Sequence, residues 1–377
     1  MALHQLLLAS MPDRVQDRLF GLLSKTAWLR SMPIIDMLLS TLEVLGGRRA
    51  ELDTAMAAAG DLGNGLALAF ETQAARTSER ASEAGATIDD AYRAALYTFV
   101  AEWAARDATR KRLLHALAIE RHDRFRKLER PPSQKVVLGG TPMTGLLRLP
   151  DAPPVGAVVL VPGNEQTKEW MRFFEEAALA RHLATLAIDP PGYGDSFYAG
   201  IRVSRQEEER CARGSLELFA SMPETGALPV ASFGLSMGGL YAHYMAGCAS
   251  GFACSASIGA PHDLLSVAGL LPSLQRRRLF ESMNLRSMAE LRAFAPTLDI
   301  DAVLARGKGP SLIFHGTNDV VVPQDEALRL AAVLGSKSEV RLQSGDDHMC
   351  TRLLRASGPG EIFDWIRRVL ESAGSQR

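Results

Sequence analysis

The sequence predicts an α/β protein in which a helical N-terminal domain precedes a mostly parallel, twisted sheet flanked by helices. Up to about residue 130 the chain is rich in Ala, Leu, Arg and Glu, and its apolar residues recur at helical spacing. Beyond that point, short β-type runs alternate with helical stretches, a pattern typical of βαβ units. A chain of 377 residues has room for two domains. We expect a helical domain over 1–130 that serves as a cap or in dimerisation, and a catalytic domain over 131–377.

The clearest predicted helix of the N-terminal domain begins after Thr87. Thr87 is a suitable N-cap because its hydroxyl can accept an amide hydrogen bond, and Asp89 and Asp90 follow in the first turn. One stripe of this helix is apolar: Ile88, Tyr92, Ala95, Leu96, Phe99 and Trp103. Such a stripe predicts core packing rather than a cofactor site. A second helix runs to about Leu128, where Pro131 and the next proline end it.

Eight short runs downstream of the prolines have the composition of strands. They are Gln134–Leu138, Thr144–Leu149, Gly156–Val161, Ala184–Ile188, Val230–Phe233, Ala253–Ile258, Ser311–Phe314 and Glu339–Leu342. The segment from about His262 to Gly307 is longer than an ordinary crossover and contains helical pieces at Leu274–Met283 and Met288–Phe294. Because open α/β sheets bind ligands beyond the carboxyl ends of their strands, we interpret residues 262–307 as a lid inserted over that edge.

Composition excludes several classes of function. Lys plus Arg number 42 and Asp plus Glu 43, so the chain lacks the basic field that nucleic-acid binding requires. Neither a phosphate-binding GxxxxGK[ST] motif nor a complete dinucleotide fingerprint occurs, and we expect no cofactor. The apolar run Leu6–Ala9 lacks the preceding basic region of a signal peptide, and no apolar run approaches the roughly 18 residues of a membrane span.

Cysteine usage indicates a reducing compartment. The four cysteines show neither a CxxC pair nor metal-ligand spacing; they are Cys211, Cys248, Cys254 and Cys350. We therefore predict free thiols, no metal site and a cytoplasmic location.

A nucleophile is predicted in 234-GLSMGG-239. Gly234-x-Ser236-x-Gly238 matches the nucleophile elbow, in which a sharp turn between a strand and a helix lifts the serine hydroxyl clear of the sheet. A serine hydroxyl needs a neighbouring base, which a third group must orient. In sheets of this type the three occur in the order serine, acid, histidine.

The acid and the base are predicted at two later strand ends. Asp319 lies in 315-HGTNDVVVP-323 after the run that begins at Ser311, and His348 lies in 345-GDDHM-349 after the last run. No histidine other than His348 follows Asp319, so chain order selects it as the base. His315 is interpreted as a structural turn residue.

Two further carboxylates compete with Asp319 for the role of the acid. Asp346 and Asp347 are too close to His348 in sequence to orient its far nitrogen easily. We interpret them as supporting the site from behind or facing solvent.

Attack by Ser236 creates an oxyanion, which needs two backbone donors. The amide of Met237 supplies one, and the amide of Asn164, after the flexible Gly163 in 161-VPGNEQTKEW-170, supplies the other. Glu165, Tyr193 in 189-DPPGYGDS-196 and His262 in 260-APHD-263 are candidates for the substrate pocket.

Together these motifs resemble the FrsA-like branch of the α/β-hydrolases, which includes 2,6-dihydroxypseudooxynicotine hydrolase and polyketide-shortening hydrolases. The resemblance rests on 163-GNEQTKEW-170, 189-DPPGYGDS-196, 234-GLSMGG-239, 315-HGTNDVVVP-323 and 345-GDDHMC-350. The branch-specific part is the loop with Gly163, Glu165, Thr167, Lys168 and Glu169. The resemblance implies an α/β-hydrolase fold with a helical N-terminal domain and a lid.

The resemblance also implies hydrolysis of a carbon–carbon bond next to a ketone, in some members followed by cyclisation. The expected substrate is a small aromatic or polyketide-like molecule, free or bound to a carrier or to CoA. Two alternatives stay open: a carboxylesterase or thioesterase with the same triad, and a non-catalytic interaction protein that retains the fold. The apolar stripes of the helical domain predict a homodimer, and we expect no nucleic-acid or membrane partner.

Overall fold

The computed structural model describes residues 11, 15–16, 33–61, 63–83 and 85–375. The chain forms two compact units. One consists of Ser133–Leu270 with Leu279–Arg377, and the other consists of the chain up to Pro132 with Leu271–Arg278. The run Leu6–Ala9 lies outside the described residues. The roles predicted for the helical domain as a cap and a dimer contact stay predictions.

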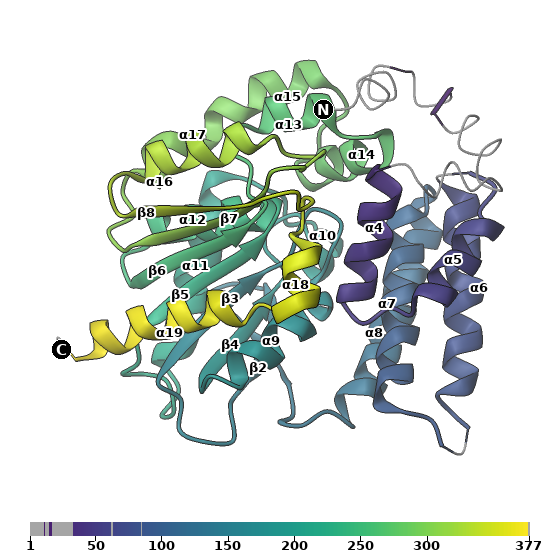
Figure 1. The fold of residues 1–377 in the computed structure, drawn as a ribbon, viewed down its shortest axis with the longest axis horizontal. Helices are drawn as coiled ribbons and strands as arrows, with labels where there is room; N and C mark the ends of the chain where they lie inside the picture. Colours follow the sequence, from purple (N-terminus) through teal and green to yellow (C-terminus); the bar gives the residue numbers. More distant parts are fainter. Residues whose placement is uncertain (1–10, 12–14, 17–32, 62, 84, 376–377) are drawn as a thin grey trace. The chain divides into compact units, whose positions relative to one another are not determined.

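The helical unit has α7 (Ile88–Ala104) at its centre (Figure 1). Four other described helices of this unit are α4 (Pro33–Val44), α5 (Arg49–Ala58), α6 (Asn64–Arg80) and α8 (Ala108–Arg126). The predicted start of α7 is confirmed, because the Thr87 hydroxyl accepts from the Asp90 amide and the Asp90 carboxylate accepts from the Thr87 amide. Tyr92, Phe99 and Trp103 are each at most 3% exposed, so the apolar stripe packs in the core as expected.

The second unit contains one eight-stranded mixed sheet with the order β1-β2-β4-β3-β5-β6-β7-β8. The strands are β1 (Gln134–Val137), β2 (Thr144–Arg148), β3 (Gly156–Val161), β4 (Leu183–Ile188), β5 (Val230–Leu235), β6 (Phe252–Ile258), β7 (Ser311–Gly316) and β8 (Ser338–Gln343). β1 and β2 are antiparallel to their neighbours, and the other pairs are parallel. All eight predicted strands are confirmed to within two residues at each end.

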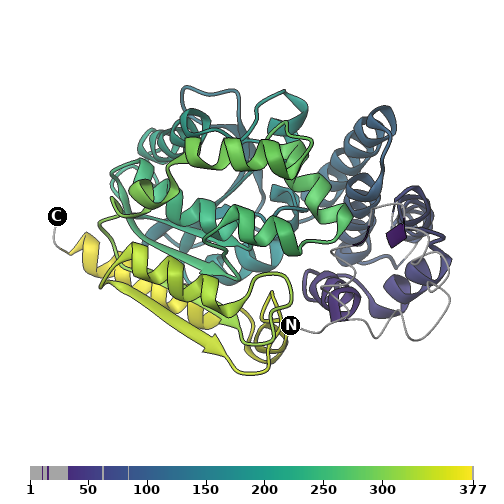
Figure 2. The same ribbon diagram turned by 90° about the horizontal axis from the view of Figure 1, so that it is seen from above.

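Two groups of helices pack on the sheet (Figures 1 and 2). In the first, α12 (Met237–Cys248) packs against β3, β5 and β6, α11 (Arg205–Ala220) packs on α12, and α17 (Gln324–Leu334) packs against β7 and β8. In the second, α9 (Arg172–Leu179) and α19 (Gly360–Gly374) contact each other and the central strands. Both faces of the central strands are therefore covered, and every residue of β3, β4 and β5 is buried.

The predicted lid segment is helical. It contains α13 (Leu264–Leu270), α14 (Ser273–Ser282), α15 (Met288–Phe294), the 3₁₀ turn η2 (Ala295–Leu298) and α16 (Ile300–Leu304). The expected helices at 274–283 and 288–294 thus form, the first shifted by one residue. Three short elements complete the second unit: η1 (Lys168–Met171), α10 (Gly194–Tyr198) and α18 (Thr351–Ser357).

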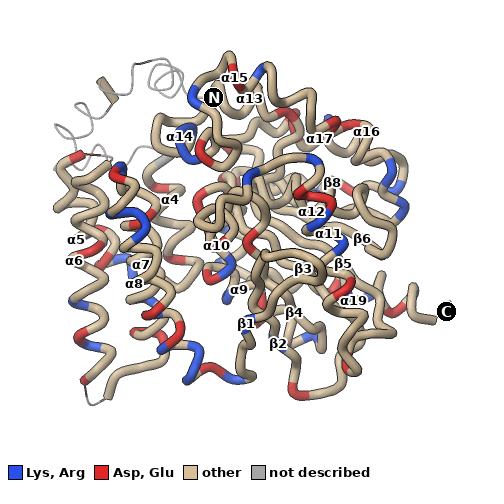
Figure 3. Tube along the Cα trace, turned by 180° about the vertical axis from the view of Figure 1, so that it is seen from behind, with Lys and Arg blue, Asp and Glu red and all other residues tan. Residues whose placement is uncertain are grey.

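Charged residues of both signs are interspersed along the described chain (Figure 3). This distribution agrees with a formal net charge of −1. Within the described part of the chain, no helix has the length and apolar character needed to cross a membrane. All four cysteines lie in described positions and are free thiols.

Candidate active site

Three polar side chains meet at the carboxyl ends of the parallel strands. Ser236 follows β5, Asp319 follows β7 and His348 follows β8. Nε2 of His348 lies 2.8 Å from Oγ of Ser236, and Nδ1 of His348 lies 2.6 Å from Oδ2 of Asp319. The structure therefore brings together the three residues that the sequence motifs singled out, in one hydrogen-bonded chain.

Ser236 occupies a strained turn between β5 and α12. Its φ of 51° and ψ of −124° lie in a region that non-glycine residues rarely adopt. Such strain is the mark of a nucleophile elbow, because it points the hydroxyl away from the backbone of the sheet. The Ser236 amide donates to the carbonyl of Ile258 on β6 over 2.7 Å and so anchors the turn to the neighbouring strand.

The two glycines of the elbow are required by close backbone contact. A Cβ on Gly234 would lie 2.0 Å from the carbonyl oxygen of Gly238. A Cβ on Gly238 would lie 2.1 Å from the carbonyl oxygen of Pro162, in the loop after β3. Only glycine lets the turn close on itself and lets the β3 loop approach it.

The side chain of Asp319 is 0% exposed, and its carboxylate is fixed by four polar groups. Its Oδ1 accepts from the amides of Val321 and Val322 at 2.8 and 2.7 Å. Its Oδ2 faces His348 at 2.6 Å and Nε2 of His315 at 3.3 Å. A carboxylate held in this way has a fixed orientation.

His315 contacts the same oxygen of Asp319 as His348 does. Its Nε2 lies 2.9 Å from the carbonyl oxygen of Val322. A carbonyl oxygen can only accept, so Nε2 carries the hydrogen. Burial lowers the pKa of His315, although the charge of Asp319 opposes this, and a lowered pKa favours the neutral ring. His315 lies near the end of β7 and contacts the predicted acid, a contact that no sequence motif indicated; its structural role stays a prediction.

Asp346 and Asp347, the alternative candidates for the acid, stabilise the loop that carries His348. Oδ1 of Asp346 accepts from the Asp347 and Arg352 amides at 3.0 Å each. Oδ1 of Asp347 accepts from the Met349 amide at 3.1 Å. Asp346 is 3% exposed, so of its two predicted settings the structure favours support of the site from behind over exposure to solvent. Its carboxylate is occupied by backbone amides, which explains why it does not orient the imidazole.

The carboxylate of Asp319 controls the basicity of His348. Burial lowers the pKa of His348, but the charge and hydrogen bond of Asp319 raise it by more, so the pKa lies above the ordinary value. Glu165 and Asp347 add to the rise through their negative charges. A raised pKa suits a residue that takes a proton from a serine hydroxyl.

The loop after β3 lies directly beside the elbow. Val161 pairs with Gly234 in the parallel register of β3 and β5. A Cβ on Gly163 would lie 3.5 Å from Cβ of Ser236, and Asn164 follows in this loop, 5% exposed. Met237 is the first residue of α12, where the amide has no acceptor within the helix. This geometry supports the prediction that both amides serve an oxyanion.

The three predicted pocket residues lie in different settings. Glu165 is half-buried and acts on the pKa of His348. Tyr193 is fully buried, and its ring packs edge-on against Tyr241 with centroids 5.9 Å apart. His262 binds Asp301 on α16 through Nε2 at 2.7 Å. Their roles in substrate binding stay predictions.

A buried ion cluster beside the site was not predicted. Nζ of Lys168, in the branch-specific loop, lies 2.6 Å from Asp189, 2.8 Å from Glu169 and 3.1 Å from Asp195. The sequence placed these residues in two separate motifs. The adjacent Lys168 and Glu169 in the polar loop 163-GNEQTKEW-170 were the available signal, but they did not reveal the other partners.

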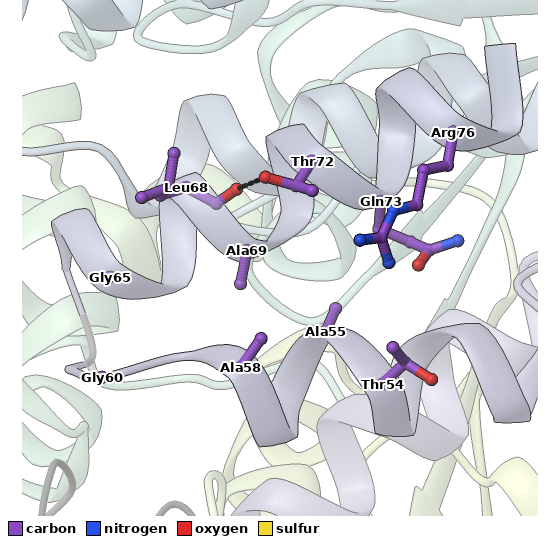
Figure 4. A pocket seen from close by; sticks show the side chains of 10 residues that line it. All are labelled: Thr54, Ala55, Ala58, Gly60, Gly65, Leu68, Ala69, Thr72, Gln73 and Arg76. Atoms are coloured by element: carbon purple, nitrogen blue, oxygen red, sulfur yellow. Dashed lines mark hydrogen bonds between the residues drawn. The ribbon is translucent and has the colours of Figure 1, made fainter. Parts of the chain in front are cut away.

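A groove between α5 and α6 contains none of the predicted site residues. It has a volume of about 410 Å³ (Figure 4). Its walls are largely apolar and include Ala55, Ala58, Leu68 and Ala69. Among the described residues, no group of three or more His, Cys, Asp and Glu side chains has the arrangement of a metal site.

Comparison with known proteins identifies relatives of the chain. No family model matches it. The 2,6-dihydropseudooxynicotine hydrolase of Paenarthrobacter nicotinovorans is 28% identical over 261 residues, which cover 68% of this chain and 70% of the relative.

Two solved structures share the fold. The crystal structure of 2,6-dihydroxy-pseudo-oxynicotine hydrolase superimposes with a TM-score of 0.71 and 23% identity, covering 89% of this chain and 96% of the other. AbyA5 superimposes with a TM-score of 0.67 and 17% identity, covering 90% and 99%. The expected fold and the expected resemblance are thereby confirmed: this chain is an enzyme of the α/β-hydrolase fold, similar to the 2,6-dihydropseudooxynicotine hydrolase.

Proposed function

We propose that this hydrolase cleaves a carbon–carbon bond next to a ketone through an acyl-enzyme on Ser236. The observation that carries the proposal is the hydrogen-bonded chain Ser236–His348–Asp319, with distances of 2.8 and 2.6 Å. In this proposal Ser236 is the nucleophile and His348 is the general base and acid. Asp319 orients the imidazole and stabilises its protonated form.

The first half-reaction begins with addition of Oγ of Ser236 to the carbonyl carbon. Nε2 of His348 takes the hydroxyl proton, and the oxyanion is held by the amides of Asn164 and Met237. The bond to the α-carbon then breaks, and its electron pair leaves as an enolate. The imidazolium of His348 protonates that carbon, so the proton returns to the substrate and an ester of Ser236 remains.

The second half-reaction is hydrolysis of this ester. Water attacks the acyl carbon while His348 takes its proton. The tetrahedral intermediate collapses, the proton passes to Oγ of Ser236, and the carboxylic acid leaves. No oxidant, reductant or further reactant is needed.

Two observations support the proposed bond type. The loop Gly163–Glu169 resembles that of a branch whose members cleave such bonds or esters, and a sequence relative is named as a 2,6-dihydropseudooxynicotine hydrolase. A carbon leaving group is far more basic than an alkoxide, so we expect substrates whose leaving carbon is stabilised as an enolate. β-Diketones and aryl ketones with a second carbonyl group in the β position, as in polyketides, satisfy this requirement.

A substrate panel tests the bond type. The enzyme is assayed with benzoylacetone, a β-diketone, and with p-nitrophenyl butyrate and a butyryl thioester as carriers of oxygen and sulfur leaving groups. We expect the diketone to be cleaved with formation of a carboxylic acid and a ketone. Rapid turnover of the esters without diketone cleavage would instead establish the esterase or thioesterase alternative.

Fluorophosphonate labelling tests the nucleophile separately. The probe should add to Ser236 in the folded wild-type protein, and the adduct should be absent from Ser236→Ala. A tryptic peptide that carries the adduct identifies the residue by mass spectrometry. Folded protein that fails to react would favour the non-catalytic interaction protein.

A further inference from the structure

Lys168 and Glu169 of the branch-specific loop have no role in the proton transfers described above. Lys168 is nevertheless one of the largest fully buried side chains of the molecule, at 0% exposure. A buried ammonium is costly unless it is paired, and this one contacts three carboxylates. The question is what the cluster holds in place.

Lys168 binds Asp189 at two points. Its backbone amide donates to Oδ1 at 2.9 Å, and its Nζ donates to Oδ2 at 2.6 Å. Asp189 is the first residue after β4, the neighbour of β3 in the sheet. The start of η1 is therefore tied by both backbone and side chain to the end of the adjacent strand.

Asp195 extends the cluster toward the edge of the sheet. Its amide donates to Oδ2 of Asp189 at 2.9 Å, and its own Oδ2 accepts from Lys168 at 3.1 Å. The hydroxyl of Thr144 on β2 and Nζ of Lys135 on β1 lie 2.9 and 3.0 Å from the same oxygen. The loop after β3 is thus fastened to β1, β2 and the loop after β4.

The pKa of Lys168 and that of Asp189 are both shifted by burial and by the neighbouring charges. Burial opposes the charge of Lys168, but the carboxylates of Asp189, Glu169 and Asp195 raise its pKa above the ordinary value for lysine. Burial raises the pKa of Asp189, although Lys168 opposes this. Lys168 is therefore a fixed cation, and removing it would leave carboxylates buried without their counterion.

The turn that contains Asn164 is held at both ends. At one end the Gly163 amide donates to Oε1 of Gln166 at 2.9 Å, and the Gln166 amide donates back to the Gly163 carbonyl at 3.0 Å. At the other end stands Lys168, four residues beyond Asn164. Gly163 faces Ser236, so the position of the Asn164 amide relative to the nucleophile depends on both anchors.

We propose that Lys168, through its contacts with Asp189 and Asp195, is a positioning residue that fixes the oxyanion-binding amide of Asn164 against Ser236. This inference rests on the proposed function, because it assumes that Asn164 donates to the oxyanion. Lys168 touches no reacting atom. Its effect is confined to the transition state, in which the developing charge requires a donor at a fixed place.

The main test compares Lys168→Met with Arg148→Met. Arg148 on β2 is also 0% exposed and pairs with Glu176 on α9 at 2.9 Å, so it is a second buried cation of the same unit. Both variants should lose thermal stability. With p-nitrophenyl butyrate, we expect K168M to lose about 10- to 100-fold in kcat with KM within about threefold, because loss of one oxyanion donor costs about 10²–10³-fold. We expect R148M to retain kcat.

A second readout separates positioning from general damage. Phenylboronic acid forms a tetrahedral adduct with an active-site serine and places an oxygen where the oxyanion forms. Its inhibition constant should rise in K168M by the same factor as kcat/KM falls. Equal losses of kcat in K168M and R148M, or an unchanged inhibition constant in K168M, would overturn the inference.

Asp189→Asn decides the outcome where K168M does not fold. The substitution keeps the shape of the side chain and removes one charge that holds Lys168. We expect a fall in kcat of about threefold to tenfold with KM unchanged, and wild-type kcat in folded D189N would refute the role of the cluster. Failure of the proposed function is recognised separately, because wild-type protein would then form no fluorophosphonate adduct on Ser236.

Discussion

Replacing Asp319 by asparagine tests the acid of the triad and its electrostatic role in one experiment. Oδ2 of Asp319 accepts from Nδ1 of His348 at 2.6 Å, while Oδ1 accepts from two backbone amides. The amides fix one side of the group as an acceptor, so the NH₂ of an asparagine must face His348. The imidazole then has to present Nδ1 as an acceptor, and its Nε2 carries the proton, which is the wrong tautomer for a base.

The size of the effect follows from the loss of tautomer and charge. We expect kcat/KM to fall by about 10³- to 10⁴-fold, the range for a triad in which the wrong tautomer is imposed. The pH dependence supplies a second, signed result. The base must be neutral, so activity falls as the pH drops through the pKa of His348. Because the charge of Asp319 raises that pKa, the acid limb of D319N should move to lower pH.

The assay is the pH profile of kcat/KM for the substrate that the panel identifies, measured for wild type, D319N and D346N. Asp346 accepts backbone amides at the start of α18 and does not contact the imidazole nitrogens, so D346N is a matched control. It should lose about 1 kcal/mol of stability and keep the acid limb in place. Retention of more than a tenth of wild-type activity in D319N, or a limb that moves to higher pH, would refute this account of Asp319.

Three other substitutions probe the supports of the site. His315→Phe removes the N–H that lies 3.3 Å from Asp319, and steady-state kinetics should show kcat lowered about threefold to tenfold at constant KM. His315→Gln keeps a donor and should retain most of the wild-type kcat. Gly238→Ala places a Cβ 2.1 Å from the Pro162 carbonyl. Thermal denaturation should therefore show a loss of about 1–3 kcal/mol or more in the free energy of unfolding, and fluorophosphonate labelling of Ser236 should slow. Unchanged labelling would show that the β3 loop can move without consequence. Glu326→Ala removes the carboxylate that accepts from the amides of His262 and Asp263 at 3.1 and 2.8 Å. The free energy of unfolding should fall by about 2 kcal/mol. Hydrogen exchange should speed up at residues 262–266 and stay unchanged at β3.

Much of the fold could be read from local sequence because its causes are local. The strands alternate with helices and are rich in β-branched residues, and the Thr87 cap is determined by the side chain itself and its partner three residues later. The elbow was recognisable because Gly234 and Gly238 are required by contacts within a single turn and with the adjoining loop. Chain order then selected His348, since it is the histidine that follows Asp319.

What the sequence by itself determined, therefore, is the order of the elements, and it selected Ser236, Asp319 and His348 as the candidates for nucleophile, acid and base. Tertiary structure decided which residues hold them. The Lys168 cluster joins side chains 21 and 27 residues apart on the loops of two neighbouring strands. Glu326 reaches the start of the lid from 64 residues away, and residues 271–278 group with the helical unit rather than with the sheet.

The physical reason is that burial strengthens contacts between distant polar side chains, whereas the periodicity of the sequence does not indicate which distant residues come together. An ammonium among carboxylates is stable only where the sheet removes water and brings the loops after β3 and β4 side by side. The same strand order that aligns Ser236, Asp319 and His348 at one edge also brings Lys168 to Asp189. Local patterns predict each strand, but the pairing of strands decides which polar side chains share a buried site.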